Sequence, residues 1–169
     1  MDSCPERKSI RLKAYDYSST GYYFITICTH ERAKLFGEIV GADSISARLI
    51  LNKAGKMIDD LYHDTINRFP NVVSAKHIVM PNHFHGIIAI ERADMESAPT
   101  LSEIIQSFKR NTTVKYIDAV KKGEFPPFNK RIWQRNYYDH IIRDEADYSA
   151  VWQYIDDNPA KWTEDEYFQ

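Results

Sequence analysis

Two histidines separated by one phenylalanine are the first candidates for chemistry. His83 and His85 stand in the run MPNHFHG at 80–86, where the residues that follow favour a strand. Because strand side chains alternate between faces, both imidazoles would project from one face and Phe84 from the other. Two imidazoles on one face form half of a metal site. A coincidental or structural pair is the alternative interpretation, and His77 could be a supporting residue of such a site.

A tyrosine and an asparagine form the second candidate. Tyr154 and Asn158 are four residues apart in a segment that is predicted to be helical, so they would be neighbours on one helix face. A tyrosine hydroxyl can act as a nucleophile, and an amide oxygen can bind a hard cation. The alternative is a tyrosine that packs and an Asn-Pro pair that ends the helix. Asp157 lies one step off the shared face and could replace Asn158 as a ligand, whereas Asp156 points away.

The third candidate is a mixture of aromatic and cationic residues at 132–143. Trp133 could stack on a base and Arg135 could contact a phosphate, although a core strand with polar ends would have the same composition. Lys109 and Arg110, on a predicted helix, could likewise face a phosphate backbone or simply water. These residue types therefore indicate nucleic-acid binding without requiring it.

The composition is that of one globular domain. The chain has 169 residues, of which 43% are hydrophobic and 27% charged, so extensive disorder is not expected. No apolar run approaches the roughly 18 residues of a transmembrane helix, and the N-terminus lacks the apolar centre of a secretory signal. The two cysteines, Cys4 and Cys28, form no CxxC pair. This pattern favours a reduced, cytoplasmic protein.

Charge is distributed unevenly along the chain. The net charge of −2 argues against a simple nucleic-acid binder. Residues 101–143 nevertheless hold nine Lys and Arg against four Asp and Glu, whereas residues 144–169 hold one Lys against eight acids. The first segment could bind phosphates while the second limits non-specific binding. The alternative is that the basic and the acidic segment simply form two solvated faces of the protein.

The elements that would position these residues follow the order β-α-β-β-α-β-α. Residues 1–20 are expected to form an arm or loop, and the ambiguous stretch 36–51 could include a short strand at 48–51. Strands are predicted at 22–28, 72–80, 83–90 and 132–143, and helices at 52–68, 101–120 and 147–157. This order is the split βαβ, ferredoxin-like pattern of the α+β class. We expect an antiparallel sheet with helices on one face, plus a C-terminal helix that carries Tyr154.

Four stretches in this order resemble the REP-associated tyrosine transposases. That family is part of the single-tyrosine HUH transposases, in which two histidines flank one hydrophobic residue. The stretches are MPNHFH at 80–85, LSEIIQSFK at 101–109, WQRNYYDHIIR at 133–143 and YIDDNP at 154–159. The resemblance covers the chain from about residue 20 to residue 162. It implies that residues 1–169 are a single HUH transposase-like domain.

The resemblance also implies an activity, namely the cleavage and rejoining of single-stranded DNA through a covalent 5′-phosphotyrosine. Tyr154 corresponds to the nucleophile, and His83, His85 and Asn158 correspond to the ligands of a Mg²⁺ or Mn²⁺ ion. The partner would be single-stranded or hairpin DNA, and the protein would be a monomer or a homodimer in the cytoplasm, associated with the nucleoid. A non-catalytic hairpin-binding module on the same fold is the alternative. Residues expected to contact DNA are Lys109, Arg110, Trp133, Arg135 and Arg143.

Overall fold

Four antiparallel strands form the central sheet. The computed structural model describes residues 19–41, 45–91 and 99–164, so Cys4 and nearly all of the expected N-terminal arm lie outside the described residues. The strand order is β4-β5-β1-β6, and each neighbouring pair is antiparallel. This is the ferredoxin-like order, which confirms the predicted α+β class. The strands are β1 (Gly21–Cys28), β4 (Val72–Val79), β5 (His83–Ile90) and β6 (Tyr138–Ile142).

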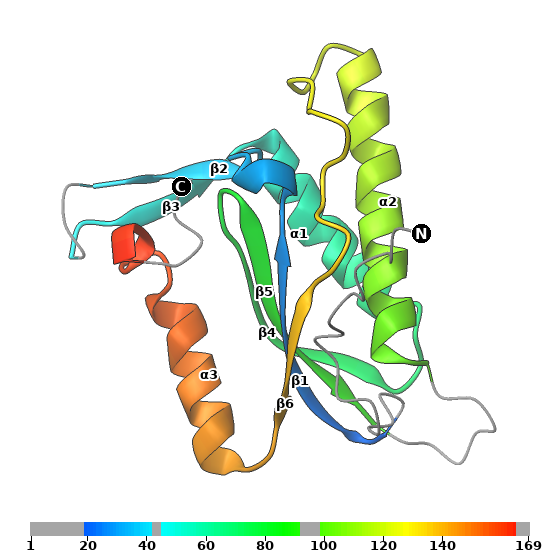
Figure 1. The fold of residues 1–169 in the computed structure, drawn as a ribbon, viewed down its shortest axis with the longest axis vertical. Coiled ribbons are helices and arrows are strands. Elements are labelled where there is room, and N and C mark those ends of the chain that lie inside the picture. The colour runs from blue at the N-terminus through cyan, green and yellow to red at the C-terminus, as the bar shows by residue number, and fades with distance from the viewer. Residues whose placement is uncertain (1–18, 42–44, 92–98, 165–169) are drawn as a thin grey trace, which may run out of the picture.

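Three helices pack on the two faces of this sheet. Helices α1 (Lys53–Ile66) and α2 (Leu101–Lys121) lie on one side, and α3 (Glu145–Asp157) lies on the other (Figure 1). Two short 3-10 helices, η1 (His30–Arg32) and η2 (Trp162–Glu164), complete the helical elements of the described residues. Within those same ranges no helix is both long and apolar enough to cross a membrane.

Side-chain oxygens fix where each helix begins. The Asn52 side chain accepts a hydrogen bond from the Gly55 N–H at 2.9 Å, at the start of α1. Thr100 and Glu103 form a reciprocal capping box at the start of α2, and Asp144 accepts from the Asp147 N–H at the start of α3. Each cap satisfies an N–H that has no partner inside the helix.

Alternation along β1 divides the interior into two cores. Tyr23, Ile25 and Ile27 point toward α1 and α2, while Phe24 points toward α3. The larger core, on the α1 and α2 side, includes Phe84 and Phe108. The smaller core, on the α3 side, consists of Phe24, Ile87, Ile142 and Ile155. Both sheet faces are therefore partly covered.

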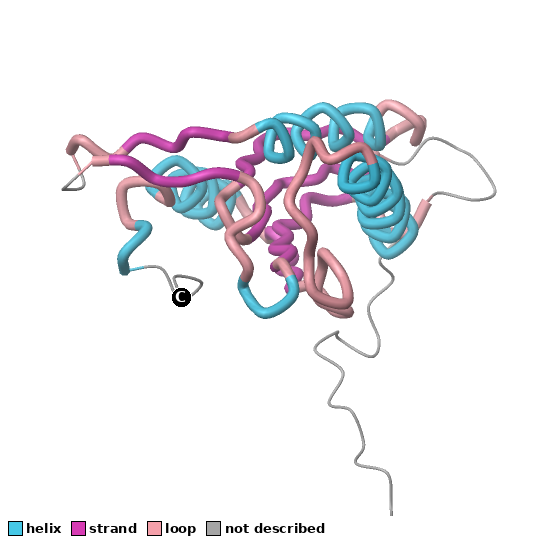
Figure 2. The backbone as a smooth tube through the Cα atoms, turned by 90° about the horizontal axis from the view of Figure 1, so that it is seen from above, coloured by secondary structure: helices cyan, strands magenta, loops and turns pink. Residues whose placement is uncertain are grey.

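The structure differs from the sequence-based prediction in two elements. The strand expected at 132–143 is shorter and begins only at Tyr138, because Trp133 makes just an isolated bridge with Thr29. The ambiguous stretch 36–51 contains an additional hairpin of β2 (Gly37–Val40) and β3 (Arg48–Leu51), and the second strand confirms the one suggested at 48–51. This hairpin extends away from the central sheet (Figure 2).

Candidate active site

The two histidines of β5 lie side by side beneath α3 and η2. His83 and His85 are fully buried, and their ring centroids are 4.4 Å apart. The His85 ring stacks on Phe24 with a centroid distance of 5.3 Å, and the His83 ring stacks on Trp162 with a centroid distance of 5.9 Å. Both imidazoles therefore share one sheet face, as the alternation of the strand predicts, while Phe84 lies in the core on the other side.

Hydrogen bonds orient both imidazole rings. His83 Nδ1 lies 2.8 Å from Asn82 Oδ1, and His85 Nδ1 lies 2.8 Å from Thr26 Oγ1. Because an amide oxygen only accepts, His83 Nδ1 carries the hydrogen, and Nε2 then presents its lone pair. In His85, Nδ1 is likewise the atom in the hydrogen bond, so Nε2 is the nitrogen left to face a metal ion. Such a hydrogen bond on the second nitrogen is the usual support of a metal-binding histidine.

Burial keeps both rings uncharged. Desolvation lowers the pKa of His83 to about 3, although the nearby Asn158 side chain opposes the shift. Desolvation also lowers the pKa of His85 well below its usual value, and the nearby His83 lowers it further. At neutral pH both residues are therefore neutral imidazoles, which is the form that binds a metal ion.

The turn before His83 is held by two distant segments. The Thr29 N–H and hydroxyl both donate to the Asn82 carbonyl oxygen, each at 2.9 Å, and the Phe36 N–H donates to the Pro81 carbonyl oxygen at 3.1 Å. These bonds fix the backbone from which both histidines project. The ends of β1 and β2 therefore help to position the histidine pair.

Tyr154 and Asn158 approach the histidines from α3. The Tyr154 ring lies 5.2 Å from the His85 ring between centroids, and 40% of the tyrosine is exposed. Asn158 is buried, and its side chain lies close enough to the His83 ring to affect the pKa of that histidine. Asn158 keeps helical backbone angles at the C-terminal end of α3, so it stands one turn beyond Tyr154. The four side chains converge from a strand and a helix that are distant in sequence.

The two acids beside Asn158 are engaged elsewhere. Asp156 pairs with Lys76 of β4. Asp157 accepts hydrogen bonds from the side chains of Lys161 at 2.8 Å and Gln153 at 2.7 Å. The alternative in which Asp157 replaces Asn158 therefore has no support from the geometry.

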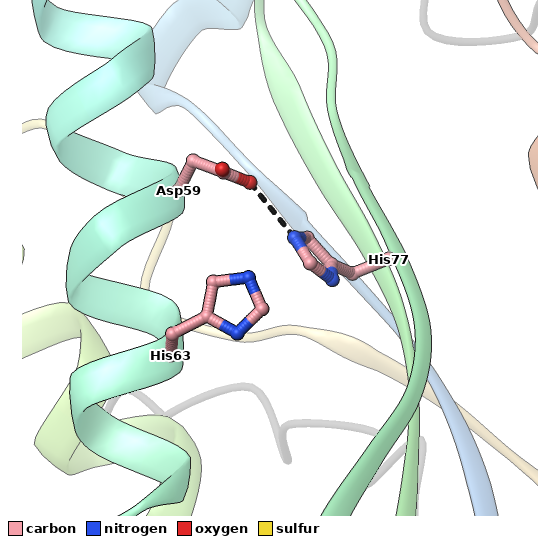
Figure 3. Close-up of side chains that lie close together, drawn as sticks. All are labelled: Asp59, His63 and His77. Atoms are coloured by element: carbon pink, nitrogen blue, oxygen red, sulfur yellow. Dashed lines mark hydrogen bonds and ion pairs between the residues drawn. The ribbon is translucent and has the colours of Figure 1, made fainter.

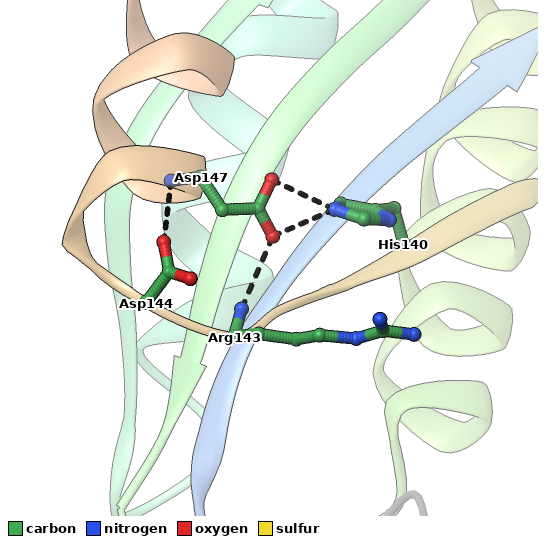
Figure 4. A network of polar contacts seen from close by, with 4 residues as sticks. All are labelled: His140, Arg143, Asp144 and Asp147. Carbon is green, nitrogen blue, oxygen red and sulfur yellow. Dashed lines mark hydrogen bonds and ion pairs between the residues drawn. The ribbon is translucent and has the colours of Figure 1, made fainter.

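Contacts at both ends of α3 fix its position on the sheet. Near its start, the Asp147 carboxylate accepts from the Arg143 N–H and lies 2.9 Å from His140 Nε2 of β6 (Figure 4). Nearer its end, the Lys76 ammonium group lies 4.5 Å from the centre of the Trp152 ring. Together these contacts hold the helix so that Tyr154 faces β5.

A pocket of about 380 Å³ opens beside Tyr154. Its walls come from β1, β6 and α3 and combine aromatic, aliphatic and polar side chains. The lining residues are Phe24, Thr26, Tyr138, His140, Ala150, Val151 and Tyr154.

Two of the residues expected to contact DNA have structural roles instead. Trp133 is buried, and its indole N–H donates to Thr112 Oγ1 at 2.9 Å, so the suggestion that it stacks on a base is not supported. The Lys109 ammonium group donates to the carbonyl oxygens of Gln134, Arg135 and Asn136 at 3.0, 3.3 and 3.1 Å. This lysine therefore anchors the loop before β6.

The other three cations expected to contact DNA are exposed. Arg110 lies on α2, Arg135 in the loop before β6 and Arg143 after the end of β6. Their guanidinium groups are accessible to a phosphate backbone.

A second histidine cluster lies on the opposite face of the sheet. Asp59 and His63 of α1 and His77 of β4 could hold a metal ion, since their ligand atoms lie within 4.8 Å of one another (Figure 3). His77 contacts Tyr62 and Phe84, which belong to the α1 side. The suggestion that His77 supports the His83 and His85 pair is therefore wrong. The i, i+4 spacing of Asp59 and His63 was the sequence signal that could have identified this cluster.

Comparisons with known proteins identify several relatives. No protein-family model matches the chain. An uncharacterized protein of Haemophilus influenzae is 36% identical over an alignment of 179 positions, which covers 96% of this chain and 93% of that protein. A second Haemophilus influenzae protein, named "Putative REP-associated tyrosine transposase", is 25% identical over 146 residues, which cover 86% of this chain and 74% of that protein.

Two solved structures share the fold. The structure of a REP-associated tyrosine transposase bound to a REP hairpin has a TM-score of 0.60 and 20% identity, and the match covers 90% of this chain and 74% of that one. The crystal structure of a protein named as a putative transposase from Deinococcus radiodurans has a TM-score of 0.52 and 14% identity, with 86% and 95% of the two chains covered.

Proposed function

We propose, from its homology to the REP-associated tyrosine transposases, that the chain belongs to that family and cleaves and rejoins single-stranded DNA as a single HUH domain. The observation that carries this proposal is the contact between the Tyr154 and His85 rings, at 5.2 Å. A half-exposed tyrosine beside two buried neutral imidazoles combines a nucleophile with metal ligands. Tyr154, His83, His85 and Asn158 are the proposed catalytic set.

In the proposed reaction, the Tyr154 oxygen attacks the phosphorus of the scissile phosphodiester. A bond forms between the tyrosine oxygen and phosphorus, and the bond from phosphorus to the 3′ oxygen breaks. The phenol loses its proton to solvent, and the departing oxygen takes up a proton to become a 3′ hydroxyl. The strand on the 3′ side of the cut stays on the protein, joined through its 5′ phosphate as a 5′-phosphotyrosine. Attack of a 3′ hydroxyl on this bond rejoins DNA without an external energy source.

His83, His85 and Asn158 fit a divalent ion such as Mg²⁺ or Mn²⁺. All three are buried, and each offers a neutral donor, which leaves the positive charge of the ion uncompensated. When bound, the ion supplies charge stabilisation at the phosphate oxygens and favours the phenolate form of the tyrosine. Imidazole ligands favour Mn²⁺ over Mg²⁺.

The surroundings of Tyr154 suit single-stranded DNA. The adjacent pocket of about 380 Å³ has the exposed Tyr138 in its wall, and an aromatic ring of this kind stacks on unpaired bases. Arg135 and Arg143 are exposed near β6 and are the proposed phosphate contacts. By analogy with the relative solved with a REP hairpin, the proposed substrate is a short hairpin with a single-stranded flank.

The test is covalent trapping on DNA. Single-stranded oligonucleotides that carry a hairpin with single-stranded flanks are incubated with the protein and Mn²⁺, then run on a denaturing gel. A 3′ label should move with the protein band, whereas a 5′ label should appear on a shorter strand. Tyr154→Phe should abolish both products while hairpin binding survives, because only the attacking oxygen is removed.

The control is Tyr138→Phe, which removes a hydroxyl from the same pocket and should leave the adduct intact. An adduct that persists in Tyr154→Phe would mean that another tyrosine is the nucleophile. Binding without any adduct would instead indicate a non-catalytic hairpin-binding module. Cleavage without an adduct would indicate an esterase that uses water.

A further inference from the structure

Asp59, His63 and His77 bring three metal-ligating side chains together away from the proposed catalytic set. Asp59 and His63 are one turn apart on α1, and His77 faces them from β4 (Figure 3). Asp59 Oδ1 lies 2.8 Å from His77 Nε2, and the His63 and His77 ring centroids are 4.8 Å apart. One carboxylate and two imidazoles are ligands that zinc commonly uses.

The sheet itself separates this cluster from His83 and His85. His77 pairs in register with Gly86 and packs against Tyr62 and Phe84, all on the side of α1. Phe84 and His85 project to opposite faces of β5. One ion could therefore not serve both groups.

One candidate ligand of the cluster, His77, is mostly buried, whereas Asp59 and His63 are more exposed to solvent. The His77 side chain is only 17% exposed, while that of Asp59 is 40% exposed, and His63 is exposed. Ligand atoms around a tetrahedral zinc ion stand about 3.3 Å apart, as follows from zinc–ligand distances near 2 Å. The ligand atoms already lie within 4.8 Å, so rotation of the exposed His63 side chain can bring it to that spacing.

We propose that Asp59, His63 and His77 bind one Zn²⁺ ion, with water as a fourth ligand, at a site independent of the catalytic one. The ion would link α1 to β4, next to the contact between Tyr62 of α1 and Phe84 of β5, whose ring centroids are 4.7 Å apart. Since Phe84 stands between His83 and His85, the zinc would strengthen the support of the strand that carries them. The proposed zinc would therefore stabilise the fold and take no part in DNA cleavage.

The test is zinc titration by calorimetry on the protein without a polyhistidine tag. His83→Ala/His85→Ala should still bind one equivalent of Zn²⁺, and zinc should raise its melting temperature. Addition of His63→Ala should remove that equivalent and the stabilisation. Asp64→Ala is the matched control, because it removes an exposed carboxylate next to His63 on the same helix and should leave zinc binding unchanged.

A second comparison does not depend on the folding of the double variant. In the otherwise unaltered protein, His63→Ala should lower the number of bound Zn²⁺ ions by one and leave Mn²⁺-dependent adduct formation unchanged. Zinc binding that is unaffected by His63→Ala, or that is lost entirely in His83→Ala/His85→Ala while that variant remains folded, would overturn the proposal.

Discussion

Burial gives His83 and His85 the chemical state that the proposed reaction needs. Both imidazoles are fully buried and each is oriented through Nδ1. A charged imidazolium in this position would lose its hydration, so the neutral form is favoured. The same burial makes the pair a source of pH-dependent stability.

This pH dependence has a definite sign. Burial lowers the pKa of His83 to about 3 and lowers that of His85, whereas an unfolded histidine titrates near 6.5. The unfolded chain therefore binds more protons between these pH values, and the stabilisation present above pH ~6.5 is lost as the pH falls toward 3. Between pH 6 and 4 we expect His83 to contribute a loss of about 1.4 kcal/mol per pH unit, and His85 to add a loss in the same direction.

Denaturant unfolding of the metal-free protein at several pH values measures this effect. The control is His83→Gln/His85→Gln, which keeps polar side chains but removes the titration, and its free energy of unfolding should depend less steeply on pH. Parallel pH profiles for the two proteins would contradict the prediction.

Single residues also show where sequence-based prediction ends. The paired orientation of His83 and His85 followed from strand alternation alone, and the neighbouring positions of Tyr154 and Asn158 followed from helical spacing. The burial of Trp133 could not be predicted in this way, because a segment that mixes aromatic and cationic residues occurs both in a protein core and on a DNA-binding surface. The position of His77 could be predicted only from the register of β4 against β5. That register places His77 on the sheet face opposite the other two histidines.

At the scale of elements, helices and long strands were predicted well, whereas β6 was not. The predicted strand at 132–143 extended too far because its β-branched and aromatic residues favour a strand throughout. In the structure, Lys109 binds the carbonyl oxygens of residues 134–136, so those groups do not pair with β1. A side chain from a distant helix therefore replaces the sheet partner of these three carbonyl groups, while the Gln134 N–H still donates to the Cys28 carbonyl oxygen of β1.

Helix α1 depends on a glycine for its close approach to the segment before β2. A Cβ at Gly55 would lie 2.1 Å from the Phe36 carbonyl oxygen and 3.0 Å from Leu51 Cδ2. The Phe36 N–H in turn bonds to Pro81 before the histidine pair. The glycine therefore permits a contact that helps to fix the proposed active site.

Gly55→Ala should therefore destabilise the protein. Glycine to alanine inside a helix normally stabilises by roughly 0.5–1 kcal/mol, but here the clash with backbone should reverse the sign and cost about 1–3 kcal/mol. Guanidinium unfolding measures the change, and Lys56→Ala, at the exposed neighbouring position, should stay within about 0.5 kcal/mol. If Gly55→Ala instead increased the free energy of unfolding, helix α1 and the segment before β2 could move apart without an energetic cost, which would contradict the prediction.

At the scale of the whole molecule, the uneven charge distribution predicts where DNA lies. The net charge is −2, yet Arg110, Arg135 and Arg143 are exposed on the segment with excess positive charge. Each phosphate contact releases counterions, which makes affinity depend on salt. Local rather than total charge should therefore control DNA binding.

The triple variant Arg110→Ala/Arg135→Ala/Arg143→Ala should weaken hairpin binding and flatten its salt dependence. Each lost contact should reduce the slope of log affinity against log salt by about 0.7–1. Fluorescence anisotropy with a hairpin oligonucleotide at increasing NaCl measures both quantities. Arg68→Ala, which changes an exposed arginine just after α1, is the control. An unchanged slope in the triple variant would place the DNA on another surface.

The proposed active site is complete within one chain. Tyr154 contacts His85 of the same chain, and the Asn158 side chain lies close to the His83 ring. Helix α3 is also held on its own sheet through Lys76, which pairs with Asp156 and lies over the Trp152 ring. A homodimer in which each chain lends its tyrosine to the other would have to break these contacts.

Complementation distinguishes the two arrangements. Tyr154→Phe lacks the nucleophile and His85→Ala lacks a metal ligand, so each alone should form no adduct with hairpin DNA. If the site is built within one chain, a mixture of the two variants should remain inactive, because no chain holds both groups. A shared site would pair the intact tyrosine of His85→Ala with the intact histidines of Tyr154→Phe and restore adduct formation on a denaturing gel. Since the described contacts join α3 to its own sheet, we expect the mixture to stay inactive at every ratio, and restored activity would mean that the helix can exchange between chains.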